Sequence, residues 1–149
     1  MADDALVATL GNVDLFQGLP QRVLAHIAES GHVARYEAGA TVIAEGAPVA
    51  GFAAFSPAGV ELHVILEGRA RVEVRGVVHA VLGPGRYFGE ISLIDGKPRS
   101  ADVVAEEGGL RTLALSKWAF EDLLEKHPEV AIPMLRVLAG RLRAQESAG

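Results

Sequence analysis

The stretch ELHVILEGRARVEVRGVVHAVLGPG, residues 61–85, decides the fold class. It divides into short extended runs, each of which ends at a glycine. In the middle run, Ala70, Val72 and Val74 alternate with charged residues. This alternation is typical of a strand with one buried and one wet face, and glycine supplies turn conformations that other residues resist. The stretch therefore predicts successive β-strands.

Similar runs occur on both sides of this stretch, between about residues 32 and 115. They are HVARYEAG, ATVIAEG, SADVVAEEGG and LRTLALS. Roughly seven or eight strands of this length predict a closed sandwich or barrel of the jelly-roll type. The fold class that we expect is mainly β: a jelly-roll barrel with N-terminal helices and a C-terminal helix pair.

Helical periodicity flanks the strands on both sides. Over about residues 4–30 we expect Asp14 to cap a helix, Pro20 to open a second one and Gly31 to end it. The helical period returns over about residues 117–145.

The C-terminal helices have recognisable start signals. Ser116 is a good N-cap and Pro128 opens the last helix. We expect Pro133 and Gly140 to weaken that helix and Trp118 to pack between helix and barrel. The apolar residues of the last helix permit a homodimer and equally permit docking on the chain's own barrel.

Length and composition narrow the class of protein. The 149 residues fit one domain, 1–149, and a hydrophobic content of 50% with 22% charged residues is typical of a globular chain. There is no cysteine, which excludes disulfides, thiolate nucleophiles and cysteine zinc sites. The start MADDALVATL carries acids where a secretory signal carries bases. We expect a cytoplasmic protein without a membrane contact, of bacterial composition.

Charge and motifs argue against several functions. The net charge is −5 and no dense cluster of Lys and Arg occurs, so we expect no nucleic-acid binding by this chain itself. The five histidines show no H-x-H pairing, so we expect no metal, and we expect His63 and His79 at the surface. A G-x-S-x-G motif is absent, and we expect no enzyme activity.

The stretch RYFGEISLIDGKPRSADV, residues 86–103, has the residue types of an anion site. Gly89 lets the backbone approach a ligand, and the short run after it can form a helix whose first N–H groups favour an anion. Arg99 suits two phosphate oxygens, and Glu90 suits sugar hydroxyls. A phosphate with a sugar hydroxyl indicates a nucleotide. From the residues alone, an ion pair of Glu90 and Arg99 that merely closes the loop is the alternative.

The segment FGEISLIDGKPRSA, residues 88–101, closely resembles the phosphate-binding cassette of the cyclic nucleotide-binding domain family. The segments DLFQGLP, HVILEGRARV and LALSKWAFEDLLEKHPEV resemble that family in order, so the resemblance covers roughly residues 12–145. It implies a β jelly-roll flanked by helices at both ends, in agreement with the periodicity.

The resemblance implies a set of nucleotide contacts. They are Leu82, Gly89, Glu90, Ile91, Ser92, Arg99 and Ser100. Arg99 would pair with the cyclic phosphate, joined by backbone N–H groups of Ser92 and Ser100, and Glu90 would take the ribose 2′-OH. Gly89 would make a close backbone contact. Leu82 and Ile91 would face the ribose or base.

The ligand that we expect is cAMP, with no cofactor. The alternative is cGMP, because the Ser100 hydroxyl can help to hold guanine. In two places the chain departs from the family pattern. The loop from Ala47 to Glu61 is longer, and the lid residue over the base is not identified, with Leu135, Leu138 and Leu142 as candidates.

The function that we expect is a regulatory sensor. Ligand binding would draw the cassette inward and move the C-terminal helices, and an unidentified effector protein or a second subunit would receive the signal. One alternative is a fragment of a catabolite-activator-type transcription regulator that lacks its helix-turn-helix. Another is a ligand-free interaction module of the same fold that uses the loop 47–59.

Overall fold

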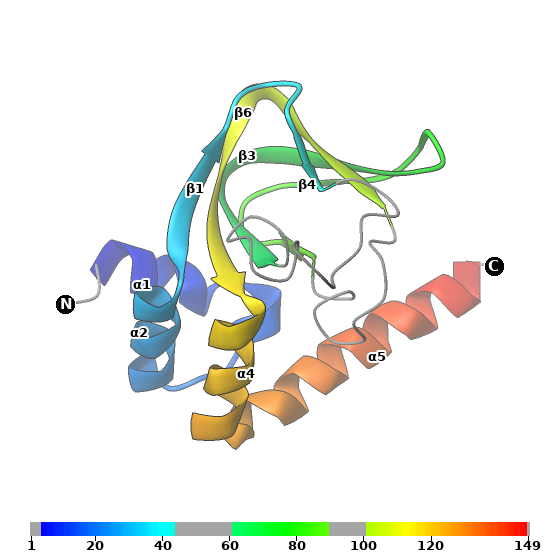
Figure 1. Cartoon of the computed structure of the whole chain (residues 1–149). Helices are drawn as coiled ribbons and strands as arrows, with labels where there is room; N and C mark the ends of the chain where they lie inside the picture. The colour runs from blue at the N-terminus through cyan, green and yellow to red at the C-terminus, as the bar shows by residue number, and fades with distance from the viewer. Residues whose placement is uncertain (1–3, 44–60, 90–100, 149) are drawn as a thin grey trace.

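The computed structural model describes residues 4–43, 61–89 and 101–148 (Figure 1). Within them the strands form one curved antiparallel sheet in the order β1-β6-β3-β4, with β2 paired to β6 and β5 to β3. The strands are β1 (His32–Tyr36), β2 (Thr41–Ile43), β3 (Glu61–Val74), β4 (Val77–Leu82), β5 (Tyr87–Phe88) and β6 (Asp102–Ser116). The expected jelly-roll class with flanking helices is confirmed.

Two strands are longer than the sequence suggested. The runs predicted as separate strands before and after Gly68 form the single strand β3, and those around Gly109 form β6. Both glycines have a positive φ, +85° and +82°, so they bend the strands instead of ending them. A side chain at Gly68 would collide with the carbonyl oxygen of Gly109. The bend therefore depends on glycine.

Strand β3 is buried on both faces over residues 61–66. Leu62 and Val64 pack with the helices, whereas Ile65 belongs to the core inside the barrel. This explains the continuous apolar run, which a strand with one wet face would not have. His63 is inside as well, with 2% of its surface exposed, so the expectation of a surface histidine was wrong. His79 is exposed, as expected.

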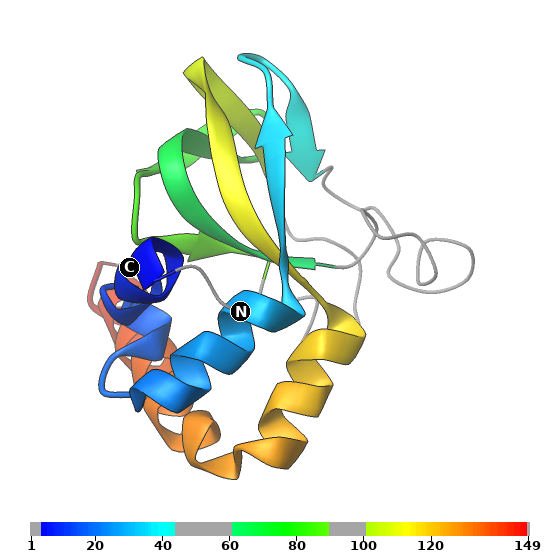
Figure 2. The ribbon, with the colours of Figure 1, turned by 90° about the vertical axis from the view of Figure 1, so that its left-hand side faces the viewer.

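The helices gather beneath one end of the barrel (Figure 2). On the N-terminal side they are α1 (Asp4–Gly11), the 3-10 turn η1 (Asp14–Phe16) and α2 (Gln21–Ser30). On the C-terminal side they are α4 (Lys117–Lys126), the 3-10 turn η3 (Pro128–Val130) and α5 (Ala131–Ala148). Their apolar faces enclose a core of their own with β3, β5 and β6.

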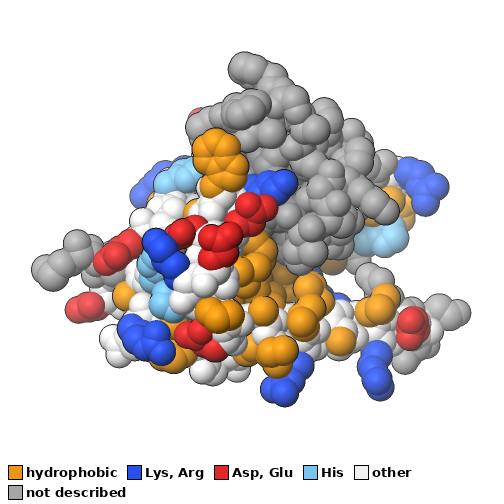
Figure 3. Space-filling view, turned by 60° about the horizontal axis from the view of Figure 1, so that its bottom comes forward, with side chains coloured by type: hydrophobic (Ala, Val, Ile, Leu, Met, Phe, Trp, Pro, Cys, Tyr) orange, Lys and Arg blue, Asp and Glu red, His pale blue; other side chains and the backbone are white. Residues whose placement is uncertain are grey.

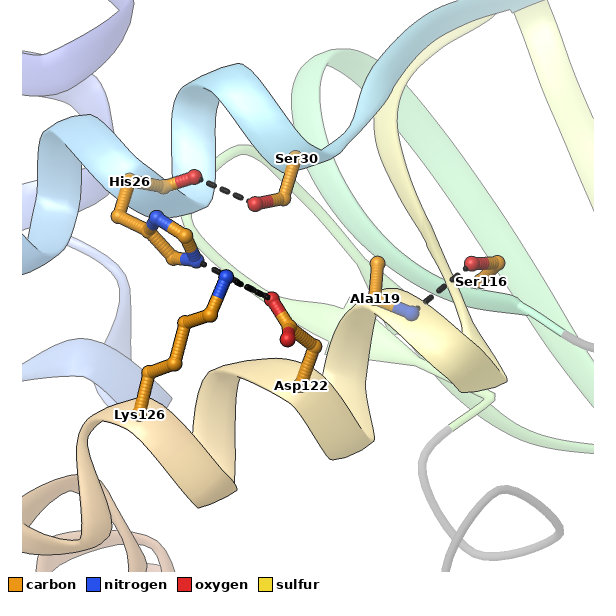
Figure 4. A network of polar contacts seen from close by, with 6 residues as sticks. All are labelled: His26, Ser30, Ser116, Ala119, Asp122 and Lys126. Atoms are coloured by element: carbon orange, nitrogen blue, oxygen red, sulfur yellow. Dashed lines mark hydrogen bonds and ion pairs between the residues drawn. The ribbon is translucent and has the colours of Figure 1, made fainter.

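Polar contacts join the two groups of helices (Figure 4). Asp122 of α4 lies 3.7 Å from the His26 ring nitrogen of α2 and 3.3 Å from the Lys126 ammonium. The Ser116 hydroxyl accepts a hydrogen bond from the Ala119 backbone N–H at 3.1 Å, which confirms the predicted N-cap. The N-terminal and C-terminal helices therefore form one layer under the barrel.

Three local expectations were wrong for identifiable reasons. Asp14 is the first residue of η1, whose N-cap is Val13. Pro133 lies in the first turn of α5, where a missing N–H removes no intrahelical bond. Trp118 is 69% exposed on α4, because Phe120 and Leu123 make up the buried side of that helix.

Candidate functional site

The candidate site lies where β5 leads out of the barrel and β6 returns to it (Figure 1). Leu82 and Gly89 belong to the described residues. The other predicted contacts lie outside them, so their roles stay predictions; these are Glu90, Ile91, Ser92, Arg99 and Ser100. The predicted loop 47–59 also lies outside the described residues.

Gly89 adopts a backbone conformation that favours glycine. Its φ is +90°, a region that residues with a Cβ rarely enter. The preceding residue, Phe88, is extended and paired with His63 of β3. Strand β5 therefore ends at Phe88, and Gly89, the first of the predicted nucleotide contacts in the cassette, follows it directly.

Leu82 ends β4 and faces the interior of the barrel. It is 8% exposed and packs in one core with Ile65 and Phe88. Opposite it on β3 lies Ala70. Leu82 thus belongs to the apolar wall beside the strand that leads into the cassette.

Further wall residues escaped the sequence analysis. Val72 and Ala80 are directly paired on β3 and β4, and both are partly buried against the interior core. They share the interior face with Leu82 because each is two positions from a member of the Ala70–Leu82 pair. The alternation in the sequence indicates that Val72 and Ala80 each lie on one face of a strand. Only the register of β3 on β4 shows that this is the face of Leu82.

A histidine supports the start of the cassette. The His63 ring stacks on Phe88 with centroids 4.9 Å apart and planes 12° from parallel. The Nδ1 atom of His63 lies 3.0 Å from the Thr112 hydroxyl, so the ring is held in place. Phe88, one residue before Gly89, is therefore fixed from inside the barrel.

The neighbouring residue connects the same strand to the last helix. Tyr87 is 1% exposed and belongs to the core that the helices share. The Arg141 guanidinium of α5 lies over the Tyr87 ring, with its central carbon 4.4 Å from the ring centroid. Such cation–π contacts contribute about 0.5–2 kcal/mol. Strand β5 thus contacts α5 directly beside the candidate site.

A buried carboxylate affects the electrostatics of the barrel interior. Glu61 is 1% exposed, and one of its oxygens lies 3.4 Å from the His32 ring nitrogen. Burial and, to a smaller extent, the charge of Glu61 raise the pKa of Tyr36 above its ordinary value. Tyr36 therefore keeps its hydroxyl proton to a higher pH than an exposed tyrosine does.

In residues 4–43, 61–89 and 101–148, no three acidic or histidine side chains come together as a metal site would require. None of the helices in these ranges has the length and hydropathy needed to cross a membrane.

The proposed lid residues are divided between two environments. Leu135 and Leu142 of α5 are 58% and 57% exposed, whereas Leu138 is partly buried. The residues of α5 that pack onto the helical core are Met134 and Val137. Met134 and Leu135 are neighbours in the sequence but point into different surroundings.

Fold and site geometry together define a jelly-roll binding domain with a helical layer. The sequence profile of the "Cyclic nucleotide-binding domain" matches residues 33–127, which is more than half of the chain. The chain belongs to this family. The resemblance on which the sequence analysis relied is thereby confirmed.

Named relatives agree with this assignment. The chain is 29% identical over 141 residues to the CRP-like cAMP-activated global transcriptional regulator of Mycobacterium tuberculosis, covering 90% of this chain and 57% of the relative. It is 34% identical over 119 residues to a cAMP-dependent protein kinase regulatory subunit of Aspergillus niger, covering 78% of this chain and 26% of that protein. The chain thus spans little more than half of the first relative and about a quarter of the second.

Solved structures show the same fold. The N-terminal domain of a transcriptional regulator from Streptomyces coelicolor A3(2) has a TM-score of 0.72 and 31% identity, covering 95% of this chain and 94% of that one. The Thermus thermophilus catabolite activator protein has a TM-score of 0.77 and 29% identity, covering 91% and 61%. The chain is therefore a cyclic nucleotide-binding regulatory domain by family.

Proposed function

We propose that this chain is a cAMP sensor whose ligand occupies the segment from Gly89 to Ser100 and acts through the C-terminal helices. The observation that carries the proposal is the family match across this segment. The M. tuberculosis relative is named as a cAMP-activated regulator, which favours cAMP over cGMP. We expect the chain to catalyse no reaction and to act in the cytoplasm.

In this proposal each contact has a distinct chemical task. The Arg99 guanidinium pairs with the cyclic phosphate, a planar donor matched to two oxygens. Backbone N–H groups of Ser92 and Ser100 complete the anion site. Glu90 accepts the ribose 2′-OH. The apolar wall at Leu82, with Ile91, borders the ribose and base.

The contacts of β5 support a route from ligand to helix. Phe88 is fixed to the barrel interior by His63, whereas Tyr87 lies under Arg141 of α5. A ligand that draws Gly89 inward would displace β5 and change its contact with α5. Such a ligand shifts the equilibrium only if it binds the closed arrangement more tightly.

Calorimetric titration tests the proposal. We expect the chain to bind cAMP with a dissociation constant on the order of micromolar, and Arg99→Ala to abolish binding while the circular dichroism spectrum is unchanged. Arg22→Ala removes an exposed arginine of α2 and serves as the matched control. If neither cAMP nor cGMP binds the parent chain at high micromolar concentration, the proposal is wrong and the ligand-free module is favoured.

The exposed apolar residues of the last helix favour a homodimer, in which the second subunit would receive the signal. The exposed residues Ile132, Leu135, Ala139 and Leu142 follow each other at intervals of three, four and three positions, the spacing of a coiled-coil seam. Figure 3 shows hydrophobic side chains gathered on the side of the molecule that the C-terminal helices form. Sedimentation should give a dimer that the double substitution Leu135→Glu, Leu142→Glu converts to a monomer.

A second candidate function is the sensory part of a transcription regulator. The near-complete match to the N-terminal domain of the Streptomyces regulator favours it. With a net charge of −5, the chain itself should not bind DNA tightly. A gel-shift assay with the 149 residues that showed tight, salt-sensitive binding would instead place a DNA contact within this chain.

A further inference from the structure

Three charged residues lie in one row across the outer face of the sheet. Arg35 of β1 is directly opposite Arg111 of β6, and Arg111 is directly opposite Glu67 of β3. Directly paired residues project on the same face. Because Leu110 and Thr112 are buried on either side of Arg111 in the strand, the Arg35–Arg111–Glu67 row faces outward.

The charges in this row do not balance. An Nη atom of Arg111 lies 2.9 Å from the Glu67 carboxylate. Arg71, also on the outer side of β3, contacts both Glu73 and Glu106. In the part of the chain that the structure describes, Arg35 has no acidic side chain within ion-pair distance. Like charges directly opposite each other destabilise a sheet, so Arg35 is placed at some cost to folding.

A surface hollow of about 200 Å³ lies beside this row. Its lining consists of Arg35, Tyr36, Glu67, Gly68, Gly108, Gly109, Leu110 and Arg111. The three glycines leave the rim without side chains, and the space beside Gly108 is open. Sites for small organic ligands usually measure about 300–1,000 Å³. This hollow is smaller, but it can admit the end of one side chain.

We propose that this hollow receives an acidic side chain of a partner protein, with its carboxylate between Arg35 and Arg111. A guanidinium binds a carboxylate through two parallel hydrogen bonds. The net charge of −5 repels acidic surfaces in general, so a local positive site determines where an acidic partner can dock. Glu37 is two positions from Arg35 in the sequence, and Glu107 is four positions from Arg111. Neither carboxylate forms an ion pair with Arg35 in the described residues.

The two arginines of this row lie on the other face of the sheet from the described wall of the predicted nucleotide site. Arg35 and Arg111 face outward, whereas Leu82 and Phe88 face the interior of the barrel. Arg35→Gln should therefore leave cAMP affinity unchanged. Its unfolding midpoint should equal or exceed that of the parent, because one of two opposed like charges is removed. A lower midpoint would identify Arg35 as a structural residue and overturn the proposal.

The test uses side-chain NMR signals of the arginine Nε–H groups. The probe is an acetylated and amidated Gly-Glu-Glu-Gly peptide, and its Gly-Gln-Gln-Gly analogue is the neutral control. We expect saturable shifts at Arg35 and Arg111 with a dissociation constant of about 1 mM, and affinity at least about tenfold weaker in Arg35→Gln. The control is Arg22→Gln, which removes an exposed arginine of α2. This variant should bind the acidic peptide as tightly as the parent chain does.

Two results would contradict the proposal. Equal shifts with the neutral peptide, or equal shifts at Arg22 and Arg35, would show that the row has no selectivity for carboxylates. A third titration uses inorganic phosphate, at concentrations that supply the same total negative charge as the acidic peptide. If phosphate binds the row more tightly than the acidic peptide does, the hollow is a site for free anions and the partner assignment is wrong.

Discussion

At the scale of single residues, Gly89 begins the segment that we propose to bind the nucleotide, and its backbone conformation favours glycine. Its φ of +90° costs a residue with a Cβ about 1–2 kcal/mol. Gly89→Ala should therefore weaken cAMP binding and reduce the free energy of unfolding by a similar amount, as measured by titration and by urea denaturation. Gly140→Ala is the control: it sits in α5 with open space around it and should stabilise the chain by roughly 0.5–1 kcal/mol.

A second residue-scale prediction concerns the support beneath Phe88. Thr112→Val keeps the shape of a buried side chain but removes the hydroxyl 3.0 Å from His63. Leaving a buried polar group without its partner costs about 1–3 kcal/mol. Urea denaturation should show a loss in this range, whereas Thr41→Val on the exposed side of β2 should change little. An unchanged midpoint for Thr112→Val would mean that this hydrogen bond does not hold the ring.

The third residue-scale prediction is a dependence on alkaline pH. Burial, followed by the charge of Glu61, raises the pKa of Tyr36 above 10.0, so the folded state keeps this proton more tightly than the unfolded state. Where the folded state binds more protons, stability falls as pH rises. The free energy of unfolding should thus be fully retained below pH 10 and decline above it. In Tyr36→Phe this decline should be smaller, and an identical decline would mean that another group titrates.

At the scale of elements, the contact between α5 and β5 is the one through which the proposed signal would pass. Arg141→Ala removes the guanidinium over Tyr87 and should lower the local stability of α5 by about 0.5–2 kcal/mol. Hydrogen exchange of the α5 amides would measure this directly. Arg143→Ala, an exposed arginine two positions further along, should leave the exchange rates unchanged. Equal acceleration in both variants would remove the special role of Arg141.

The elements also show how far the sequence alone could lead. Alternation identified the strands, and the cassette motif identified the family. The division of β3 and β6 was predicted wrongly because a glycine at positive φ can either end a strand or bend it. Burial of His63 was missed because β3 is covered on both faces. Val72 and Ala80 required the register of β3 on β4, which no local pattern contains.

At the scale of the whole molecule, two cores meet at β3 and β5. One fills the barrel and the other lies between the barrel and the helices. A ligand that binds only the folded chain should therefore stabilise both together. At about 100 times the dissociation constant, cAMP should add about 2.7 kcal/mol. Thermal denaturation should show a single shifted transition, and Arg99→Ala should show no shift.

Strand β5 consists of only Tyr87 and Phe88, and successive side chains of a strand project in opposite directions. One ring anchors in the barrel and the other in the helical layer. Because β5 has only two residues, no flexible residue separates the two rings. If the ligand acts as proposed, a tilt of the Phe88 ring would reach the Tyr87 ring through a single peptide unit. Strand β5 would then couple the barrel to the helical layer by its geometry.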